Sequence, residues 1–586
     1  MKKIITLLLV FVTTNIYTAE NRANNLKLCL NQQEESLNHV DSNKVVSAAI
    51  QCMTSFLSEV NKEYELKEIS DNLNLDSVFD RYKYPFNVFP LPGLVAMGNE
   101  GNSAGHNSGD YYNVYYGGGA HSTSSGEDCS PGVSPTTHCT GNTAMGWQSM
   151  KAVKGEFSVA MGYRSMYSAT TGGKNVAIGY ESLYSSTTEG NLTGIGYQAA
   201  KANTSGSGTV AVGYQALTAN TTGDGNSALG YEALTANTTG NYNNAFGYTA
   251  LEDNTTGQYN VGMGYEALSS NTTANNNTGI GHVSLKSNTT GTQNTGVGGN
   301  SLQANTTGSY NTALGYQASN YSTEGDYNVA VGTYSLAAAT TADGNTSIGY
   351  QALYTATTEG SLTAIGYQAA KANTSGSGTV AVGYQALTAN TTGNYNTAIG
   401  HEALYSNTTG QQNTAIGHES LYSNTTGIRN TASGNMALYS NTDGDYNTAM
   451  GQTSLYSNTT GRHNTTSGFK TLYENTTGDY SAAFGSQALA SNTTGSKNKA
   501  IGYGALFYNT TGSNNIALGY LALFSNTTAD LNTALGYQAL YSNTTGTKNI
   551  GIGPDSLYDN TTGNQNVGIG YVALASNTTG SSNFGL

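Results

Sequence analysis

The chain has 586 residues, of which only 10% are charged, and its formal net charge is −14 at pH 7. This charge argues against binding to nucleic acid or to an anionic membrane surface, since both attract positively charged proteins. The 74 glycines and 43 tyrosines also set the composition apart from that of an ordinary globular enzyme.

Residues 1–19 have the pattern of a secretory signal peptide. Two lysines precede an apolar run from Ile4 to Val12, and a polar stretch then ends at Ala19. The apolar run is too short to span a bilayer, which favours a cleaved signal over a membrane anchor. We therefore expect an exported protein that is extracellular or lies on a bacterial cell surface, associated with the outer membrane.

Residues 20–72 are predicted to form a small helical hairpin. Apolar residues recur there at helical spacing, from Val45 to Val60. An exported chain with four cysteines is expected to form two disulfides, for which three pairings are possible. We favour the local pairing, Cys29 with Cys52 and Cys129 with Cys139.

Residues 73–140 are predicted to be a linker followed by an insertion rich in Gly, Ser and Tyr. Three of the eight histidines, His106, His121 and His138, lie in this insertion near acidic residues. Their spacing is looser than that of a metal site, so we expect a polar loop and no bound metal.

Residues 141–586 are built from one short repeat. A glycine recurs every seventeen residues from Gly162 to Gly570, and an irregular first unit around Gly146 brings the total to 26 repeats. Seventeen residues are too few for a helix pair but suit two strands of about five residues and two tight corners. We therefore predict an all-β fold, a parallel β-roll or β-solenoid in which each repeat is one coil.

The repeat contains two columns of large apolar residues. With the recurring glycine as position 0, position −1 is aliphatic, Met or Phe in 24 of 26 repeats, and position +4 is Leu in 21. We expect both columns to form the core, and the alanines at −2 and +3 to form smooth outer strips. Ser433 and Ser467 interrupt position −1, so the segment 401–486 is predicted to open first.

Polar residues of the repeat mark its corners. The stretch Asn-Thr-Thr-Gly begins at position +7, where Asn and Gly tolerate positive φ and stacked Asn amides can bond from coil to coil. The recurring glycine itself indicates a backbone conformation or a close approach that a Cβ would block.

The strand sequences Ser158–Gly162 and Thr397–Gly400 resemble the head repeats of trimeric autotransporter adhesins, the YadA-like heads; related repeats occur in phage tail-fibre proteins. The resemblance implies a left-handed parallel β-roll, a homotrimer of chains packed side by side, and binding to host matrix or other surfaces. The seventeen-residue unit is longer than that of the family, and neither a coiled-coil stalk nor the family's C-terminal membrane anchor follows the repeats.

The sequence ends at Leu586, just before the glycine of a further repeat. A strand edge left open there is a template for pairing. We expect this edge to dock onto another copy, giving end-to-end filaments, or onto a separate anchor protein; the alternative is that the reading frame has lost a longer C-terminal part.

Residues typical of catalysis are scarce in the repeats, which contain no Gly-x-Ser-x-Gly, His-Glu-x-x-His or phosphate-loop pattern. We therefore expect no enzyme activity, no catalytic residue and no cofactor. His401 and His418 occupy the same position in adjacent coils and are predicted to stack about 4.8 Å apart.

Position +1 is the candidate contact surface, because it is Tyr in fifteen of 26 repeats. Exposed tyrosines on a rigid body suit binding to an extracellular protein or glycan, whereas Tyr can also fill a corner or a seam between chains simply as a good β residue. The candidate contact column begins with Tyr163, Tyr180, Tyr197, Tyr214, Tyr231, Tyr248 and Tyr265.

Two classes of function follow from this pattern. The first is a secreted or surface-displayed fibrous adhesin or structural protein. The alternatives are an ice-binding β-solenoid, because Thr recurs in register along one edge, or a phage-derived, tail-fibre-like binding protein. Against ice binding, the paired threonines are adjacent, so they point to opposite sides of the chain.

Overall fold

The computed structural model describes residues 114–116, 141–151 and 155–586. The predicted signal peptide, the helical hairpin at 20–72, the four cysteines and the three histidines of the insertion all lie outside the described residues. Within the described ranges, no helix has the length and apolar character needed to cross a membrane.

The described residues contain 28 short strands and belong to one compact unit. The strands are β1 (Val114–Tyr116), β2 (Thr143–Met145), β3 (Val159–Met161), β4 (Val176–Ile178), β5 (Thr193–Ile195), β6 (Val210–Val212), β7 (Ser227–Leu229), β8 (Asn244–Phe246), β9 (Val261–Met263), β10 (Thr278–Ile280), β11 (Thr295–Val297), β12 (Thr312–Leu314), β13 (Val329–Val331), β14 (Thr346–Ile348), β15 (Thr363–Ile365), β16 (Val380–Val382), β17 (Thr397–Ile399), β18 (Thr414–Ile416), β19 (Thr431–Ser433), β20 (Thr448–Met450), β21 (Thr465–Ser467), β22 (Ala482–Phe484), β23 (Lys499–Ile501), β24 (Ile516–Leu518), β25 (Thr533–Leu535), β26 (Ile550–Ile552), β27 (Val567–Ile569) and β28 (Phe584–Gly585).

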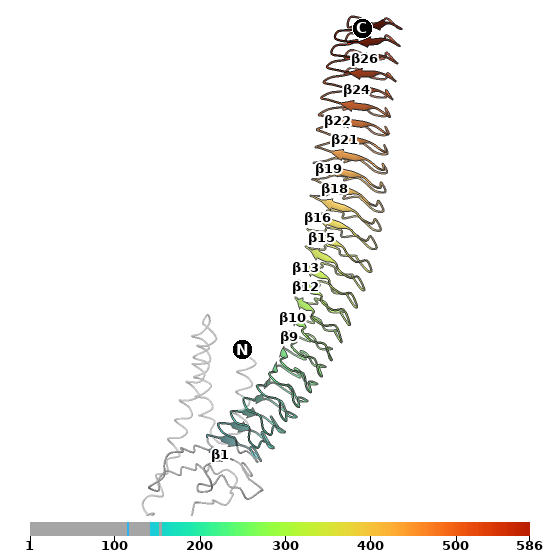
Figure 1. The fold of residues 1–586 in the computed structure, drawn as a ribbon. Coiled ribbons are helices and arrows are strands. Elements are labelled where there is room, and N and C mark those ends of the chain that lie inside the picture. Colours follow the sequence, from blue (N-terminus) through green and yellow to red (C-terminus); the bar gives the residue numbers. More distant parts are fainter. Residues whose placement is uncertain (1–113, 117–140, 152–154) are drawn as a thin grey trace, which may run out of the picture. The chain divides into compact units, whose positions relative to one another are not determined.

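Each strand pairs in parallel with the next strand along the chain, so that the coils stack in a single column (Figure 1). From β3 onward the partners are seventeen residues apart, as in the pairing of Val159 with Val176. The predicted parallel β-solenoid is therefore confirmed. Strand β1, which pairs with β2, lies in a segment that was expected to be a loop.

The prediction of two strands per coil was wrong, because each of the 26 complete coils has one strand of three residues. The expected second strand is a turn segment with left-handed residues at positions +2 and +4, such as Gln215 (φ 53°) and Leu217 (φ 52°). Gln215 N donates to the preceding coil, at Tyr197 O (2.8 Å), and Leu217 N donates to the following coil, at Ala233 O (3.0 Å). The left-handed residues thus direct the N–H group at +2 toward the preceding coil and the N–H group at +4 toward the following coil. Both groups are hydrogen-bonded although the segment forms no strand.

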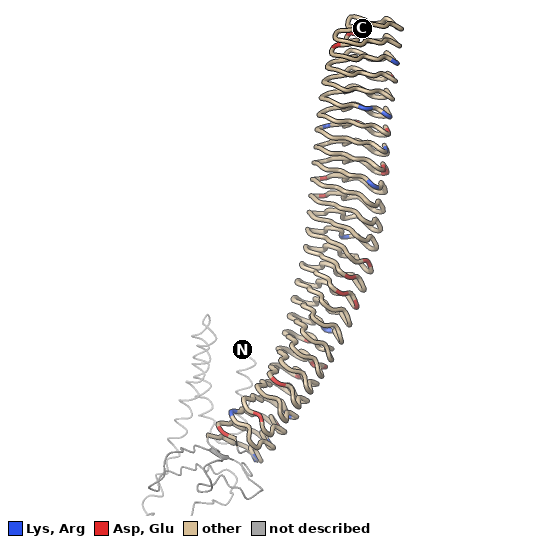
Figure 2. The backbone as a smooth tube through the Cα atoms, in the orientation of Figure 1, with Lys and Arg blue, Asp and Glu red and all other residues tan. Residues whose placement is uncertain are grey.

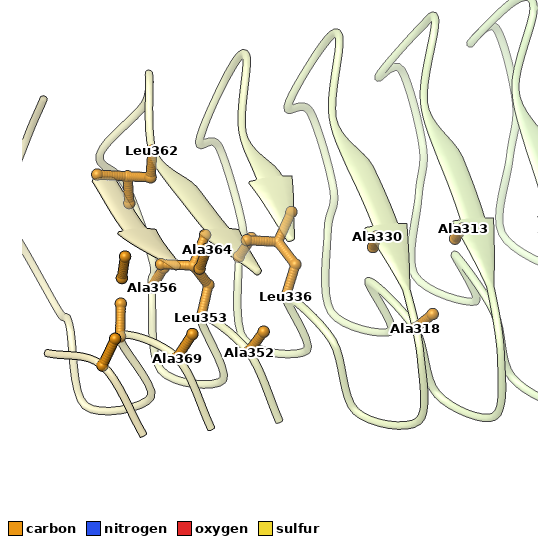
Figure 3. Packing of buried hydrophobic residues seen from close by; sticks show 14 of the residues in the cluster. Ala313, Ala318, Ala330, Leu336, Ala352, Leu353, Ala356, Leu362, Ala364 and Ala369 are labelled. Carbon is orange, nitrogen blue, oxygen red and sulfur yellow. The ribbon is translucent and has the colours of Figure 1, made fainter. Parts of the chain in front are cut away.

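The core is a column of leucines packed against alanines. Leucines at +4 and alanines at −2 and +3 are fully buried, and Figure 3 shows Leu336 and Leu353 directed into the interior of the coils. The space is narrow: a Cβ added to Gly262, at −2 in β9, would lie 3.1 Å from Leu251 Cγ. Only a small residue therefore fits at position −2.

The predicted core column at position −1 was wrong, because its side chains point outward. Successive side chains alternate across a strand, so the buried alanine at −2 directs position −1 to the outer face. Leu229 and Met450 are 49% and 51% exposed. The alanines do not form outer strips, and Ser433 and Ser467 lie outside the core, which removes the reason for an early-opening segment at 401–486.

The recurring glycine meets both expectations. Gly383 has a φ of 139°, and a Cβ added there would lie 2.2 Å from Gly400 O of the next coil. Backbone conformation and close contact between coils therefore both require glycine at position 0.

The predicted ladder of stacked asparagines at +7 is confirmed. Asn220 is fully buried, and its Nδ2 donates to Asn203 Oδ1 of the preceding coil (2.7 Å) and to Gly223 O of its own coil (3.1 Å). The ladder runs from Asn203 to Asn305 and again from Asn373 to Asn577. Between these segments, Ser322 and two alanines replace it, and the buried Asn305 Oδ1 has no partner among the described residues.

Candidate functional site

The predicted contact column at position +1 forms a continuous stack of tyrosine rings. Each ring from Tyr163 to Tyr265 follows the glycine that ends its strand, so the stacking of the coils brings the rings into register. Neighbouring ring centroids lie 5.0–5.3 Å apart with interplanar angles of 7–10°. The seven side chains are 36–46% exposed.

This geometry limits what the column can present to a ligand. Since each inner ring is covered on both faces by its neighbours, the exposed parts are the ring edges and the phenolic hydroxyls. A phenol hydroxyl both donates and accepts hydrogen bonds, and the ring edge offers apolar contact. The column therefore offers a repeating polar and aromatic surface, and it offers no open ring faces along its length.

Acidic residues at position +2 raise the pKa of the neighbouring tyrosine phenols at +1. Desolvation, followed by the negative charge of Glu232, raises the pKa of Tyr231 above its ordinary value. At Tyr265 the hydrogen bond and charge of Glu266 raise the pKa. These tyrosines therefore stay protonated, and able to donate, at neutral pH.

The side chains at position +2 also form a ladder of their own. Gln198 Nε2 donates to Glu181 Oε2 (3.0 Å), and Lys201 Nζ lies 2.7 Å from the same oxygen. Although partial burial opposes it, hydrogen bonds from Lys201 and Gln198 lower the pKa of Glu181. Arg164, also at +2, lies over both Tyr163 and Tyr167, at 5.1 and 5.5 Å from the ring centroids. Position +2 thus lies between the +1 column and a second aromatic column.

Sequence reasoning missed two further aromatic columns. The first is at position +5, where five successive tyrosines stack at 5.1–5.2 Å from Tyr405 to Tyr473. The second is at position −5, where Tyr446, His463 and Tyr480 stack at 4.9 and 4.8 Å. Both show the seventeen-residue period that revealed the +1 column, so the same count at other positions would have found them.

The predicted stacking of His401 on His418 is confirmed, with ring centroids 5.0 Å apart. Each histidine has one nearby carboxylate, since His401 Nδ1 lies 3.8 Å from Glu402 Oε2 and His418 Nδ1 lies 3.7 Å from Glu419 Oε2. Among the residues that the structure describes, no group of three or more metal-binding side chains is brought together.

Threonines at the Asn-Thr-Thr-Gly corner have different environments. The first threonine, at +8, donates its hydroxyl to the backbone of the next coil, as in Thr221 Oγ1 to Thr238 O (3.0 Å). The second, at +9, is exposed, as at Thr222 and Thr392. One of the two threonine columns is therefore engaged within the stack, which leaves a single exposed row.

Comparisons with protein-family models, with curated proteins and with solved structures gave no match for this chain.

Proposed function

We propose that this chain is an exported fibrous adhesin, without enzymatic activity, that displays its aromatic columns to an extracellular protein or glycan. The observation that carries the proposal is the unbroken stack of exposed tyrosines from Tyr163 to Tyr265 on a rigid, repetitive β-solenoid. Equivalent contacts at every coil suit an extended ligand, because many weak contacts on one rigid body reinforce each other. The resemblance to adhesin head repeats supports the same function.

The tyrosine column can be tested by removing three central rings. We expect a variant with Tyr197→Ser, Tyr214→Ser and Tyr231→Ser to lose binding to arrayed extracellular-matrix proteins and glycans. Serine is a matched replacement, because Ser486 occupies this position naturally. A companion variant with Phe at the same three positions keeps the stack and removes only the hydroxyls. Unchanged binding by the serine variant would contradict the proposal.

We further propose that the chains associate as a homotrimer through the outward apolar column at position −1. Its most exposed members are Met145, Met161, Leu229, Met263, Ile280, Leu314, Ile348, Ile365, Ile399, Ile416, Met450, Phe484, Ile501 and Ile569. With 26 coils at about 4.8 Å and a strand length of about 10 Å, the outer face that carries this column measures roughly 1,200 Å². The face also carries position −3, which is often threonine, and its extent suits a partner surface of about 800 Å² or more. A long apolar column on such a face is typical of a protein contact.

Sedimentation analysis tests this seam. We expect Ile399→Asp with Ile416→Asp to weaken the trimer, because two charges would be buried in each chain's contact face. Thr392→Asp with Thr409→Asp is the matched control, since both threonines are exposed at the corner, away from the strand face. A wild-type chain that sediments only as a monomer would refute the trimer.

The ice-binding alternative has its own measurement. Because the threonine hydroxyls at +8 are bonded within the stack, we expect the purified protein to show no thermal hysteresis. A clear hysteresis gap that disappears when the exposed threonines at +9 are replaced would favour ice binding over adhesion.

A further inference from the structure

One surface pocket interrupts the regular side of the solenoid at the coil of Gly502. The pocket has a volume of about 650 Å³ and is lined by Tyr480, Lys497, Lys499, Asn514 and Ile516. Three of these residues occupy position −5 in successive coils, and Lys499 and Ile516 begin strands β23 and β24. The pocket therefore lies where the corner meets the outer face of the strands.

The two lysines place positive charge in this pocket. Lys497 has a left-handed backbone (φ 59°) and Lys499 begins a strand. Both side chains are exposed on either side of the buried Asn498, and both line the same pocket. Neither forms an ion pair with another described residue. Lys499 is also the only charged residue in strands β1–β28, and charged residues are scattered thinly over the rest of the stack (Figure 2).

Two carboxylates in the surrounding coils accept hydrogen bonds from backbone N–H groups. Asp479 Oδ1 accepts a hydrogen bond from Arg462 N, and Asp530 Oδ1 accepts one from Ser513 N, each at 2.6 Å. Since neither lysine forms an ion pair with a described residue, both ammonium groups can meet a ligand, in a protein whose net charge is otherwise negative.

Tyr480 gives the pocket an aromatic wall. One face of its ring stacks on His463 of the preceding coil (4.8 Å). No ring of the described residues stacks on its other face, because the next coil has Lys497 at this position, and the side chain is 56% exposed. The aromatic column thus ends here, and its last ring lies in the same pocket as the two lysines.

We propose that this pocket binds a sulfated or carboxylated sugar unit. The lysines would hold the anionic group through charge-assisted hydrogen bonds, Tyr480 would pack against the sugar ring, and the Asn514 amide would bond to a sugar hydroxyl. Such binding would give the proposed adhesin a class of ligand and a defined binding pocket, and its biological meaning rests on that proposed function.

The test measures binding of a sulfated heparin tetrasaccharide to the purified full chain by calorimetry at low and high salt. We expect Lys497→Gln with Lys499→Thr to lower the affinity by about tenfold for each lysine removed, and added salt to weaken wild-type binding. Threonine is a matched replacement, because it begins 13 of the other 27 strands. Tyr480→Ser should weaken binding several-fold, and Ser361 shows that serine is accepted at this position.

Lys548→Gln is the control, because Lys548 occupies position −5 three coils later and does not line the pocket. It should leave the affinity unchanged. The inference is overturned if the wild type does not bind the tetrasaccharide, if the double variant binds as well as wild type, or if a neutral tetrasaccharide binds equally. Inorganic sulfate that binds as tightly as the tetrasaccharide would overturn the sugar assignment. The tyrosine variants described above test adhesion separately, so either proposal can fail alone.

Discussion

Replacing the recurring glycine of one central coil should locally unfold the stack. Gly383→Ala places a Cβ on a residue with a φ of 139°, a conformation that is essentially restricted to glycine. The same Cβ would lie 2.2 Å from Gly400 O, a backbone atom that cannot rotate away. Two separate costs therefore act at this site.

Gly570 allows the two costs to be separated. It has a similar φ of 123°, but the atom nearest to an added Cβ is Leu586 C at 3.5 Å. Backbone strain alone costs about 1–3 kcal/mol, so Gly570→Ala should lose about that much. Adding a backbone clash places Gly383→Ala at about 4–5 kcal/mol, among the largest effects of single substitutions.

Hydrogen exchange measures these losses coil by coil. A loss of about 4 kcal/mol corresponds to an opening about 1,000-fold more frequent, so amides from 397 to 404 should exchange that much faster in Gly383→Ala. Amides from 567 to 574 should accelerate by about 10- to 100-fold in Gly570→Ala. Equal acceleration in the two variants would show that the close approach between coils is not what requires glycine.

Three further outcomes are expected. Leu404→Ala should lower the free energy of unfolding by about 2–5 kcal/mol because Leu404 is fully buried, whereas Ile399→Ala in the monomeric chain should cost far less; a larger loss at Ile399 in chemical denaturation would restore position −1 to the core. Ser322→Asn should slow hydrogen exchange in the coils around 305–339, because the new amide can donate to the unpaired Asn305 Oδ1, with a gain of about 1 kcal/mol; unchanged exchange would mean that the asparagine ladder adds no stability. Raised pKa values of Tyr231 and Tyr265 mean that the unfolded chain loses these protons first, so the contribution of these two tyrosines to stability should be constant below pH 10 and fall above it; absorbance titration that shows ordinary tyrosine ionisation in the folded chain would contradict this.

The period of the repeat made the solenoid predictable, but the orientation of the strand was not. Position −1 holds the larger and more apolar side chain of the strand, so hydrophobicity alone assigns it to the core. The interior is set instead by the short distance between the strand and the turn segment, where Leu251 leaves room for little more than Gly262. That distance depends on backbone geometry at positions +2 and +4, and the Leu and Gln found there give no sign of a left-handed conformation.

The candidate site was predictable in part for the same reason. Exposure of the +1 tyrosines follows from their place just after the strand, and their stacking follows from the period. The pocket at Lys497 and Lys499 depends on two lysines that depart from the usual residues of the repeat. Its significance depends on whether other side chains already contact these lysines. A departure of this kind becomes meaningful only when the structure shows that Tyr480 stacks on a ring on one face alone and that neither lysine forms an ion pair with a described residue.

The asparagine ladder has a direction, because in each bonded pair the later coil donates and the earlier coil accepts. A completed coil therefore presents a bare carbonyl oxygen toward the part of the chain that is synthesised next. The contacts that join a new coil to the stack link residues about seventeen positions apart, so little loop-closure entropy has to be overcome. Each folded coil thus offers the hydrogen-bond acceptors to which the following coil can bind. The solenoid can therefore fold coil by coil while the rest of the chain is still being synthesised.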